Sequence, residues 1–201
     1  MKRILAIALA TLLALPGLAL AQGKFAYTEL KPTQPTESAP GKVEVLEFFW
    51  YGCPHCYSLE PAIEVWTKKL PADVQFRRVP AVFNERWGHD AAIFYTFEAL
   101  GVLNKLHRPF FDAIHRDRLR TDNAAAFNGW LQKQGVDPQK FAATMRSMGV
   151  MTSTKRAAKL TVDYDIRGTP AMAVHGRYTV GSDEAMLQTV DKLVAAVRKN
   201  K

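Results

Sequence analysis

Cys53 and Cys56 are the only cysteines in the 201-residue chain, and they enclose the motif Cys53-Pro54-His55-Cys56. Only a thiolate exchanges with a disulfide, so two cysteines separated by two residues are suited to forming and breaking a disulfide reversibly. The motif follows the pattern of a buried strand and opens a helical pattern, which is typical of a redox-active pair. The sequence therefore predicts thiol-disulfide exchange at these two residues.

Other uses of the cysteine pair have less support. A structural disulfide across four residues would restrain the unfolded chain by only about 2 kcal/mol. Covalent haem attachment requires a histidine after the second cysteine, where this chain has Tyr57. A zinc site needs two further ligands, and no histidine pair has typical ligand spacing, so we expect no metal. We expect the histidines outside the motif at the surface: His89, His107, His115 and His175.

Cys53 stands where the predicted helix begins, which favours its thiolate. Lowering its pKa by two units takes about 2.7 kcal/mol, whereas a helix terminus supplies roughly 0.3 to 1 and at most about 2 kcal/mol. We therefore expect backbone N–H groups of the first turn and the His55 side chain to donate hydrogen bonds to the thiolate, with Pro54 fixing the turn. Cys56 falls on the apolar face of the helix and should be less accessible. Cys53 is thus predicted to be the attacked sulfur, and a stabilised thiolate makes the disulfide form an oxidant.

The elements around the motif form a βαβ pattern. Residues 43–50 are almost continuously apolar, as in a strand buried on both faces. A helical pattern follows from Cys56 to Leu70 and is ended by Pro71, and residues 74–79 read as a second strand. Strand, helix and strand in this order predict a parallel pair with a right-handed crossover.

Helical patterns then dominate from about residue 84 to residue 163. We predict helices at 91–100, 106–115, 124–134, 138–148 and 152–163. Asp122 and Asp137 are expected to cap the third and fourth of these, the latter followed by Pro138. Residues 171–174 and 178–180 then flank a His175-Gly176 turn, which predicts an antiparallel hairpin. A last amphipathic helix follows, with Ser182 as the expected N-cap.

Three segments resemble the thioredoxin superfamily, and within it the DsbA family of periplasmic disulfide-forming oxidases. They are Glu47-Phe48-Phe49, the run from Cys53 to Tyr57, and Arg167-Gly168-Thr169-Pro170-Ala171-Met172 followed by Gly176-Arg177-Tyr178. The resemblance covers most of residues 43 to 181. It implies an α/β, thioredoxin-like fold with an inserted all-helical domain. We expect an extended N-terminal segment at 22–42, the thioredoxin-like domain at 43–83 and 164–201, and the helical insertion at 84–163.

The resemblance also implies roles for residues outside the motif. Pro170 would follow a cis peptide bond opposite the disulfide, and Thr169 would pair with the backbone of an extended substrate. Thr169 departs from the family pattern. The best-known oxidases have valine at this position, and threonine is more typical of isomerase relatives. Glu47 would handle the proton of Cys56, with Arg78 as its charge partner. The alternative for Glu47 is a strand-edge residue that faces solvent, since glutamate is rarely buried without a partner.

The N-terminus has the pattern of an export signal. Lys2 and Arg3 precede an almost uncharged run at 4–20, and Ala19-Leu20-Ala21 suits cleavage after Ala21. Cleavage leaves about 180 residues, enough for one folding unit, and no later stretch has the roughly 20 apolar residues of a membrane span. The formal net charge of +8 is scattered, and no nucleic-acid-binding motif is present. We expect a soluble periplasmic protein that does not bind nucleic acid.

These observations predict an enzyme that donates the Cys53-Cys56 disulfide to newly exported, reduced proteins. The resemblance implies reoxidation by a quinone-linked inner-membrane partner of the DsbB type, and no bound cofactor is required. We expect a monomer. Too few residues precede Cys53 for the dimerisation domain that related isomerases carry, which argues against an isomerase. A related reductase or isomerase is one alternative, distinguished by redox potential. A peptide-binding chaperone is another, which would remain active after both cysteines were replaced by serine.

Overall fold

The structure is a computed structural model that describes residues 26–199. Its five strands form one sheet in the order β1-β5-β4-β2-β3. The predicted export signal and its cleavage point after Ala21 lie outside the described residues. Within residues 26–199, no helix is both long and apolar enough to cross a membrane. The strands are β1 at Thr28–Glu29, β2 at Val43–Phe49, β3 at Val74–Pro80, β4 at Ala171–Val174 and β5 at Tyr178–Val180.

Strand β2 is the centre of the fold. All seven of its residues are buried, as the continuous apolar run predicts for a strand covered on both faces. It pairs in parallel with β3 and antiparallel with β4, and β4 and β5 form the predicted hairpin. Helix α1, at Pro54–Thr67, connects β2 to β3. The predicted βαβ unit is therefore confirmed, although α1 ends before the predicted limit at Leu70.

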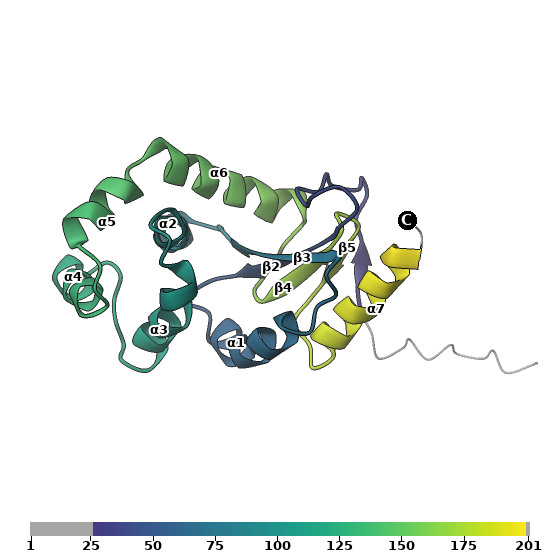
Figure 1. Ribbon diagram of the computed structural model, residues 1–201, viewed down its shortest axis with the longest axis horizontal. Coiled ribbons are helices and arrows are strands. Elements are labelled where there is room, and N and C mark those ends of the chain that lie inside the picture. Colours follow the sequence, from purple (N-terminus) through teal and green to yellow (C-terminus); the bar gives the residue numbers. More distant parts are fainter. Residues whose placement is uncertain (1–25, 200–201) are drawn as a thin grey trace, which may run out of the picture.

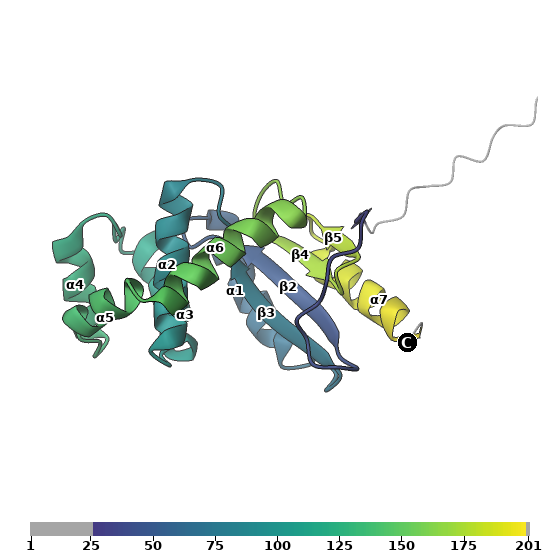
Figure 2. The ribbon, with the colours of Figure 1, turned by 90° about the horizontal axis from the view of Figure 1, so that it is seen from above.

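The helices form two layers and one lateral group (Figure 1). Helices α1 and α7 lie against one face of the sheet, while α6 crosses the other face (Figure 2). Helices α2 to α5 gather beyond one end of the sheet, so the helical segment stands beside the thioredoxin-like part. The bounds are α2 at Glu85–Ala99, α3 at Leu103–His115, α4 at Ala124–Lys133, α5 at Pro138–Met145, α6 at Met148–Asp163 and α7 at Met186–Lys199.

Several helix starts differ from the sequence prediction. The Asn84 side chain accepts a hydrogen bond from the Trp87 N–H, so α2 begins one and a half turns before its apolar pattern becomes regular. Asn123, and not Asp122, caps α4 in the same way, whereas the predicted cap at Asp137 is confirmed for α5. Ser182 is too far from Met186 to cap α7. Side-chain oxygens that reach a free N–H decide these starts, and the apolar period alone does not locate them.

The main aromatic cluster joins the helical segment to the redox motif. Phe49 and Tyr51 from the end of β2, together with Cys53 and Cys56, pack in one buried cluster with apolar side chains of α2 to α5. The helical segment therefore contributes directly to the surroundings of both sulfur atoms. The exact domain limits predicted at residues 83/84 and 163/164 stay a prediction.

Replacing Gly176 by alanine is expected to destabilise the protein by about 2 to 3 kcal/mol, because a left-handed backbone and a contact disfavour a side chain there. Gly176 has φ +67°, and an added Cβ would lie 2.0 Å from the backbone oxygen of Gln34. Gly41 is a matched control, since it has φ +80° and no atom within 4 Å of an added Cβ. Urea unfolding should show a loss of only about 1 kcal/mol for Gly41→Ala. Equal losses in the two variants would contradict this role of the Gln34 contact.

Candidate active site

Cys53 is the N-cap of α1, with an extended backbone at φ −84° and ψ 116°. Its sulfur accepts a hydrogen bond from the Cys56 N–H at 3.3 Å, and its thiol lies 3.3 Å from the Thr169 carbonyl oxygen. Hydrogen bonding from Cys56 is the largest of the effects that lower the Cys53 pKa from 9.0 to about 5. Burial opposes the shift, while hydrogen bonds from Thr169 and from the backbone of Cys56 and His55 add to it. Cys53 is therefore a thiolate at neutral pH.

Cys56 has the opposite properties. It lies one turn inside α1 with no exposed surface, whereas Cys53 is 6% exposed. Burial raises the pKa of the Cys56 thiol above its ordinary value, and the nearby Cys53 raises it further. Two sulfur atoms in one motif thus differ in charge at neutral pH, which makes exchange at Cys53 favourable and leaves Cys56 protonated.

The other residues of the motif lie at the surface. Pro54 occupies the first turn of α1, where its missing N–H leaves no hydrogen bond unmade, and both Pro54 and His55 are exposed. His55 contributes to the low Cys53 pKa through its backbone N–H. The separate role predicted for the His55 imidazole stays a prediction.

The loop before β4 lies against the redox motif. The Thr169–Pro170 peptide bond is cis, and the Thr169 carbonyl oxygen is the atom that faces the Cys53 sulfur. Both residues also line a cavity of about 450 Å³ between this loop and strands β1 and β5. Two segments more than a hundred residues apart in the sequence are thus brought together at one sulfur atom.

A buried charge cluster lies behind the motif. Glu47 is 1% exposed on the central strand β2, so the solvent-facing alternative is wrong. The Arg78 guanidinium lies 3.1 Å from the Glu47 carboxylate and 2.5 Å from that of Glu60, which is also 1% exposed. Burial raises the pKa of Glu47 to about 8, although the positive charge of Arg78 opposes this shift. Glu47 therefore holds a proton through much of the neutral range.

Comparisons with known proteins agree with this geometry. Residues 78–194 match the profile of the DSBA-like thioredoxin domain. The thiol:disulfide interchange protein DsbA of Azotobacter vinelandii is 42% identical over 177 residues, which is 86% of this chain and 82% of that protein. The chain belongs to the DsbA-like thioredoxin family. It is accordingly a thiol-disulfide oxidoreductase with a thioredoxin-like fold and a helical insertion.

Solved DsbA structures share the fold over most of their length. The crystal structure of Pseudomonas aeruginosa DsbA has a TM-score of 0.77 and 37% identity, covering 88% of this chain and 92% of that one. DsbA from Xylella fastidiosa has a TM-score of 0.80 and 31% identity, covering 86% and 95%. The likeness therefore includes both the thioredoxin-like part and the helices inserted into it.

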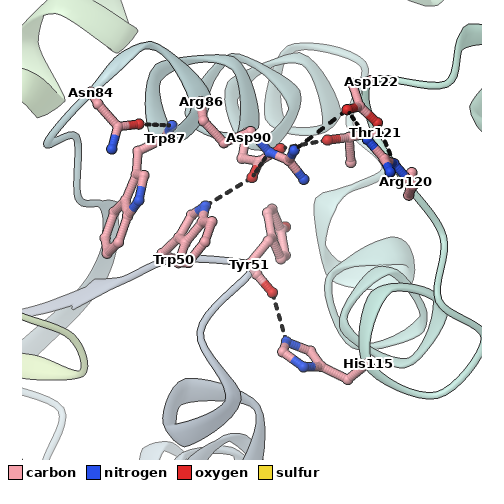
Figure 3. Close-up of polar contacts among 10 residues, drawn as sticks. All are labelled: Trp50, Tyr51, Asn84, Arg86, Trp87, Asp90, His115, Arg120, Thr121 and Asp122. Atoms are coloured by element: carbon pink, nitrogen blue, oxygen red, sulfur yellow. Dashed lines mark hydrogen bonds and ion pairs between the residues drawn. The ribbon is translucent and has the colours of Figure 1, made fainter.

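In this DsbA-like chain, the helical insertion holds Trp50, the residue that follows β2 (Figure 3). The Trp50 indole N–H donates to the buried Asp90 carboxylate at 2.8 Å, and the Thr121 hydroxyl donates to the same carboxylate at 2.9 Å. The Trp50 ring also stacks on Trp87, with 4.2 Å between ring centroids. The wall beside the redox motif is thus fixed from α2 and from the loop before α4.

Tyr51 is held from α3. His107 Nδ1 lies 2.9 Å from the Tyr51 hydroxyl, and His115 Nε2 lies 2.8 Å from the Tyr51 carbonyl oxygen. His107 is buried, so the expectation that all histidines outside the motif lie at the surface is wrong for it. A histidine among phenylalanines is buried here because its ring nitrogens face polar groups on other elements.

Sequence reasoning missed Glu60, Asp90 and His107. Glu60 lies four residues after Cys56 and so shares its face of α1, a spacing that could have identified it. Asp90 and His107 interrupt the apolar faces of α2 and α3, but an interruption of this kind does not tell which distant group will pair with it.

Proposed function

We propose that the Cys53-Cys56 disulfide is the one that this DsbA-family enzyme donates to newly exported proteins. The observation that carries the proposal is the opposite perturbation of the two thiols, with the Cys53 pKa lowered to about 5 and the Cys56 pKa raised. A substrate thiolate attacks Cys53, the bond between Cys53 and Cys56 breaks, and Cys56 leaves with the electron pair. A second substrate thiolate then attacks the mixed disulfide and releases Cys53 as a stable thiolate.

Thr169 and Pro170 are proposed to form the docking edge for the substrate backbone. Their support is the 3.3 Å approach of the Thr169 carbonyl to the Cys53 sulfur, next to the cavity that both residues line. A peptide with its cysteine at Cys53 would therefore run along this loop.

Glu47 is proposed to handle the proton of Cys56, with Arg78 holding its carboxylate. The support is that Glu47 is buried, paired with Arg78, and protonated through much of the neutral range. A buried acid of this kind can supply a proton to a leaving thiolate that solvent does not reach.

The same proposal includes the compartment, the substrates and the partner that reoxidises the protein. DsbA relatives are periplasmic proteins, and we propose that this chain reaches the periplasm with its leader removed after Ala21. Reduced exported proteins would be its substrates, and a quinone-linked inner-membrane enzyme of the DsbB type would reoxidise it. We propose that the protein acts as a monomer.

Alkylation of the reduced protein tests the assignment of Cys53. At pH 6, iodoacetamide should modify Cys53 at least about 100-fold faster than Cys56, because only Cys53 is largely a thiolate at that pH. Mass spectrometry of the digested protein gives both rates, and urea-unfolded protein is the control, in which the two rates should be similar. Faster labelling of Cys56 in the folded protein would reverse the assignment.

Oxidation of a peptide substrate tests the function. Oxidised protein should convert an equal amount of a reduced two-cysteine peptide to its disulfide, and Cys53→Ser should abolish this conversion. If Cys53→Ser still oxidised the peptide, the proposed exchange at this residue would be wrong.

A further inference from the structure

His107 of α3 has one ring nitrogen paired and one unpaired. Its Nδ1 meets the Tyr51 hydroxyl at 2.9 Å. Its Nε2 is buried with no hydrogen-bond partner among the described residues, and the Glu60 carboxylate lies 3.6 Å away, beyond hydrogen-bond range. The imidazole is otherwise surrounded by the rings of Phe49, Phe94 and Phe111. An unpaired polar atom in such a place requires an explanation.

Other polar atoms of the same cluster lack a hydrogen bond. One carboxylate oxygen of Glu60 is buried without a hydrogen-bond partner among the described residues, and Glu47 Oε2 and Arg78 Nε, which lack one too, contact each other as an ion pair at 3.1 Å. The Arg78 guanidinium joins the two carboxylates, and Glu60 lies next to His107. Together these groups form a continuous polar path from β2 to α3, with open hydrogen-bonding positions along it.

A cavity of about 390 Å³ connects this path to the surface between α1 and α3. Buried Glu60 and His107 line its inner part, and exposed Lys68 and Asn104 line its outer part. Polar groups in a cavity of this size can bind several bridging waters, each of which can join two groups too far apart for direct contact. The cavity therefore brings solvent next to the His107 side chain, whose Nε2 atom is itself buried.

The exchange reaction requires proton delivery to a buried atom. When a substrate thiolate attacks Cys53, its electron pair forms the new S–S bond, and the pair of the Cys53-Cys56 bond leaves with Cys56. Cys56 has no exposed surface, and a thiolate with a raised pKa is a poor leaving group. A proton must therefore arrive as the bond breaks. Glu60, one turn beyond Cys56 on the same face of α1, and Glu47 are the acids of this path.

We propose that His107 is the relay residue that returns protons from the solvent-filled cavity to the Glu60–Arg78–Glu47 cluster during thiol-disulfide exchange. The proposal rests on the function proposed above. His107 acts through Glu60 and Glu47 and does not touch the sulfur atoms. A neutral imidazole can accept a proton at one nitrogen and donate from the other, which suits it to this role. When Glu47 gives its proton to Cys56, His107 passes a proton from the cavity to Glu60, and a bridging water carries it on to Glu47 while Arg78 stays protonated. When Cys56 is reoxidised, its proton leaves by the reverse route.

The surroundings of His107 set its pKa and therefore its ability to transfer a proton. Burial lowers the pKa of His107, which favours the neutral ring, while the Glu60 carboxylate 3.6 Å from Nε2 opposes the shift. The titratable and charged groups around it are Glu60, Glu64 and Lys68 of α1, Arg78 of β3, Tyr51 of the loop after β2, and Arg108 of α3 itself, with Glu47 of β2 in contact with Arg78.

Multiple-turnover kinetics of His107→Gln, with glutathione disulfide as the oxidant, test the proposal. Glutamine can keep a hydrogen bond to Tyr51 but does not transfer protons. The steady-state rate at which a reduced two-cysteine peptide is oxidised at pH 7 should fall at least about tenfold, because the Glu47 carboxylate is no longer reprotonated through the relay and general acid assistance to the leaving group is lost after the first turnover. The equilibrium constant with glutathione should change less than about twofold, since a relay changes the rate and not the end states. His89→Gln, which removes an exposed histidine of α2, should leave both quantities unchanged.

Chemical rescue gives a second test that does not depend on the glutamine side chain. Imidazole added to His107→Ala should enter through the cavity and restore the rate, whereas pyrazole, which has the same shape but is far less basic, should not. A wild-type rate in His107→Gln, equal rescue by both compounds, or a rate and an equilibrium constant that change by the same factor would overturn the proposal. Failure of the proposed function is distinguishable, because peptide oxidation would then be absent in the wild-type protein as well.

Discussion

The relative stability of the two redox forms is expected to reverse with pH. The reduced protein should be about 2 kcal/mol more stable than the oxidised protein at pH 8, and about 1.5 kcal/mol less stable at pH 5. The two forms should be equally stable at about pH 6.5. Most disulfide-bonded proteins instead remain more stable when oxidised.

The lowered Cys53 pKa determines which redox form is the more stable at each pH. Because it is lowered from 9.0 to about 5, the folded reduced form gains stability that is complete above pH 9 and disappears as pH falls through 5. The gain is about 3 kcal/mol at pH 7, whereas the disulfide restrains the unfolded chain by only about 2 kcal/mol. Cys56 stays protonated over this range, because its pKa is raised.

Urea unfolding of both forms from pH 5 to pH 8 measures this difference. Comparing the two forms at each pH removes the effect of groups that titrate alike in both. Cys53→Ala is the control, since the thiolate is absent and the stability gained by the reduced protein between pH 5 and pH 8 should be lost with it. If the oxidised form were the more stable at every pH in this range, the thiolate would not be stabilised, and a reductase-like or purely structural disulfide would be favoured.

Replacing Arg78 by methionine is expected to destabilise the protein by about 3 to 5 kcal/mol, because the buried Glu60 carboxylate loses its cation and the buried Glu47 carboxyl group loses the same partner. Glu47 and Glu60 are each 1% exposed, and the Arg78 guanidinium contacts both. Removing one member of a buried ionic cluster costs more than the net value of the cluster, since the remaining charges are left desolvated. The loss should shrink at acidic pH, where protonated carboxyl groups no longer need a cation.

Arg198→Met is the matched control, because the Arg198–Asp73 pair is 44% exposed on each side. Its removal should change the free energy of unfolding by at most about 1 kcal/mol. Arg78→Lys should recover part of the loss by restoring the charge. A loss of about 1 kcal/mol or less for Arg78→Met, with no dependence on pH, would show that the buried carboxyl groups are neutral without it.

The sequence alone determined the redox pair and the elements on either side of it. The spacing of Cys53 and Cys56, the apolar run of β2 and the hairpin turn at His175-Gly176 are local patterns, and each predicts its structure from neighbouring residues. The low Cys53 pKa is partly local as well, because its largest cause, hydrogen bonding from Cys56, lies within the same helical turn, although Thr169 also lowers it from more than a hundred residues away. This explains why the chemistry could be predicted before the structure was described.

Only the tertiary structure decided which buried polar groups meet. Glu47 and Arg78 are opposite each other because β2 and β3 pair in parallel in that register. Glu60 and His107 meet because α1 and α3 pack together, and Asp90 receives the Trp50 indole because α2 covers the end of β2. A sequence pattern shows that a polar residue interrupts an apolar face, but the free energy of burying it depends on a partner far along the chain, and only the folded arrangement supplies that partner.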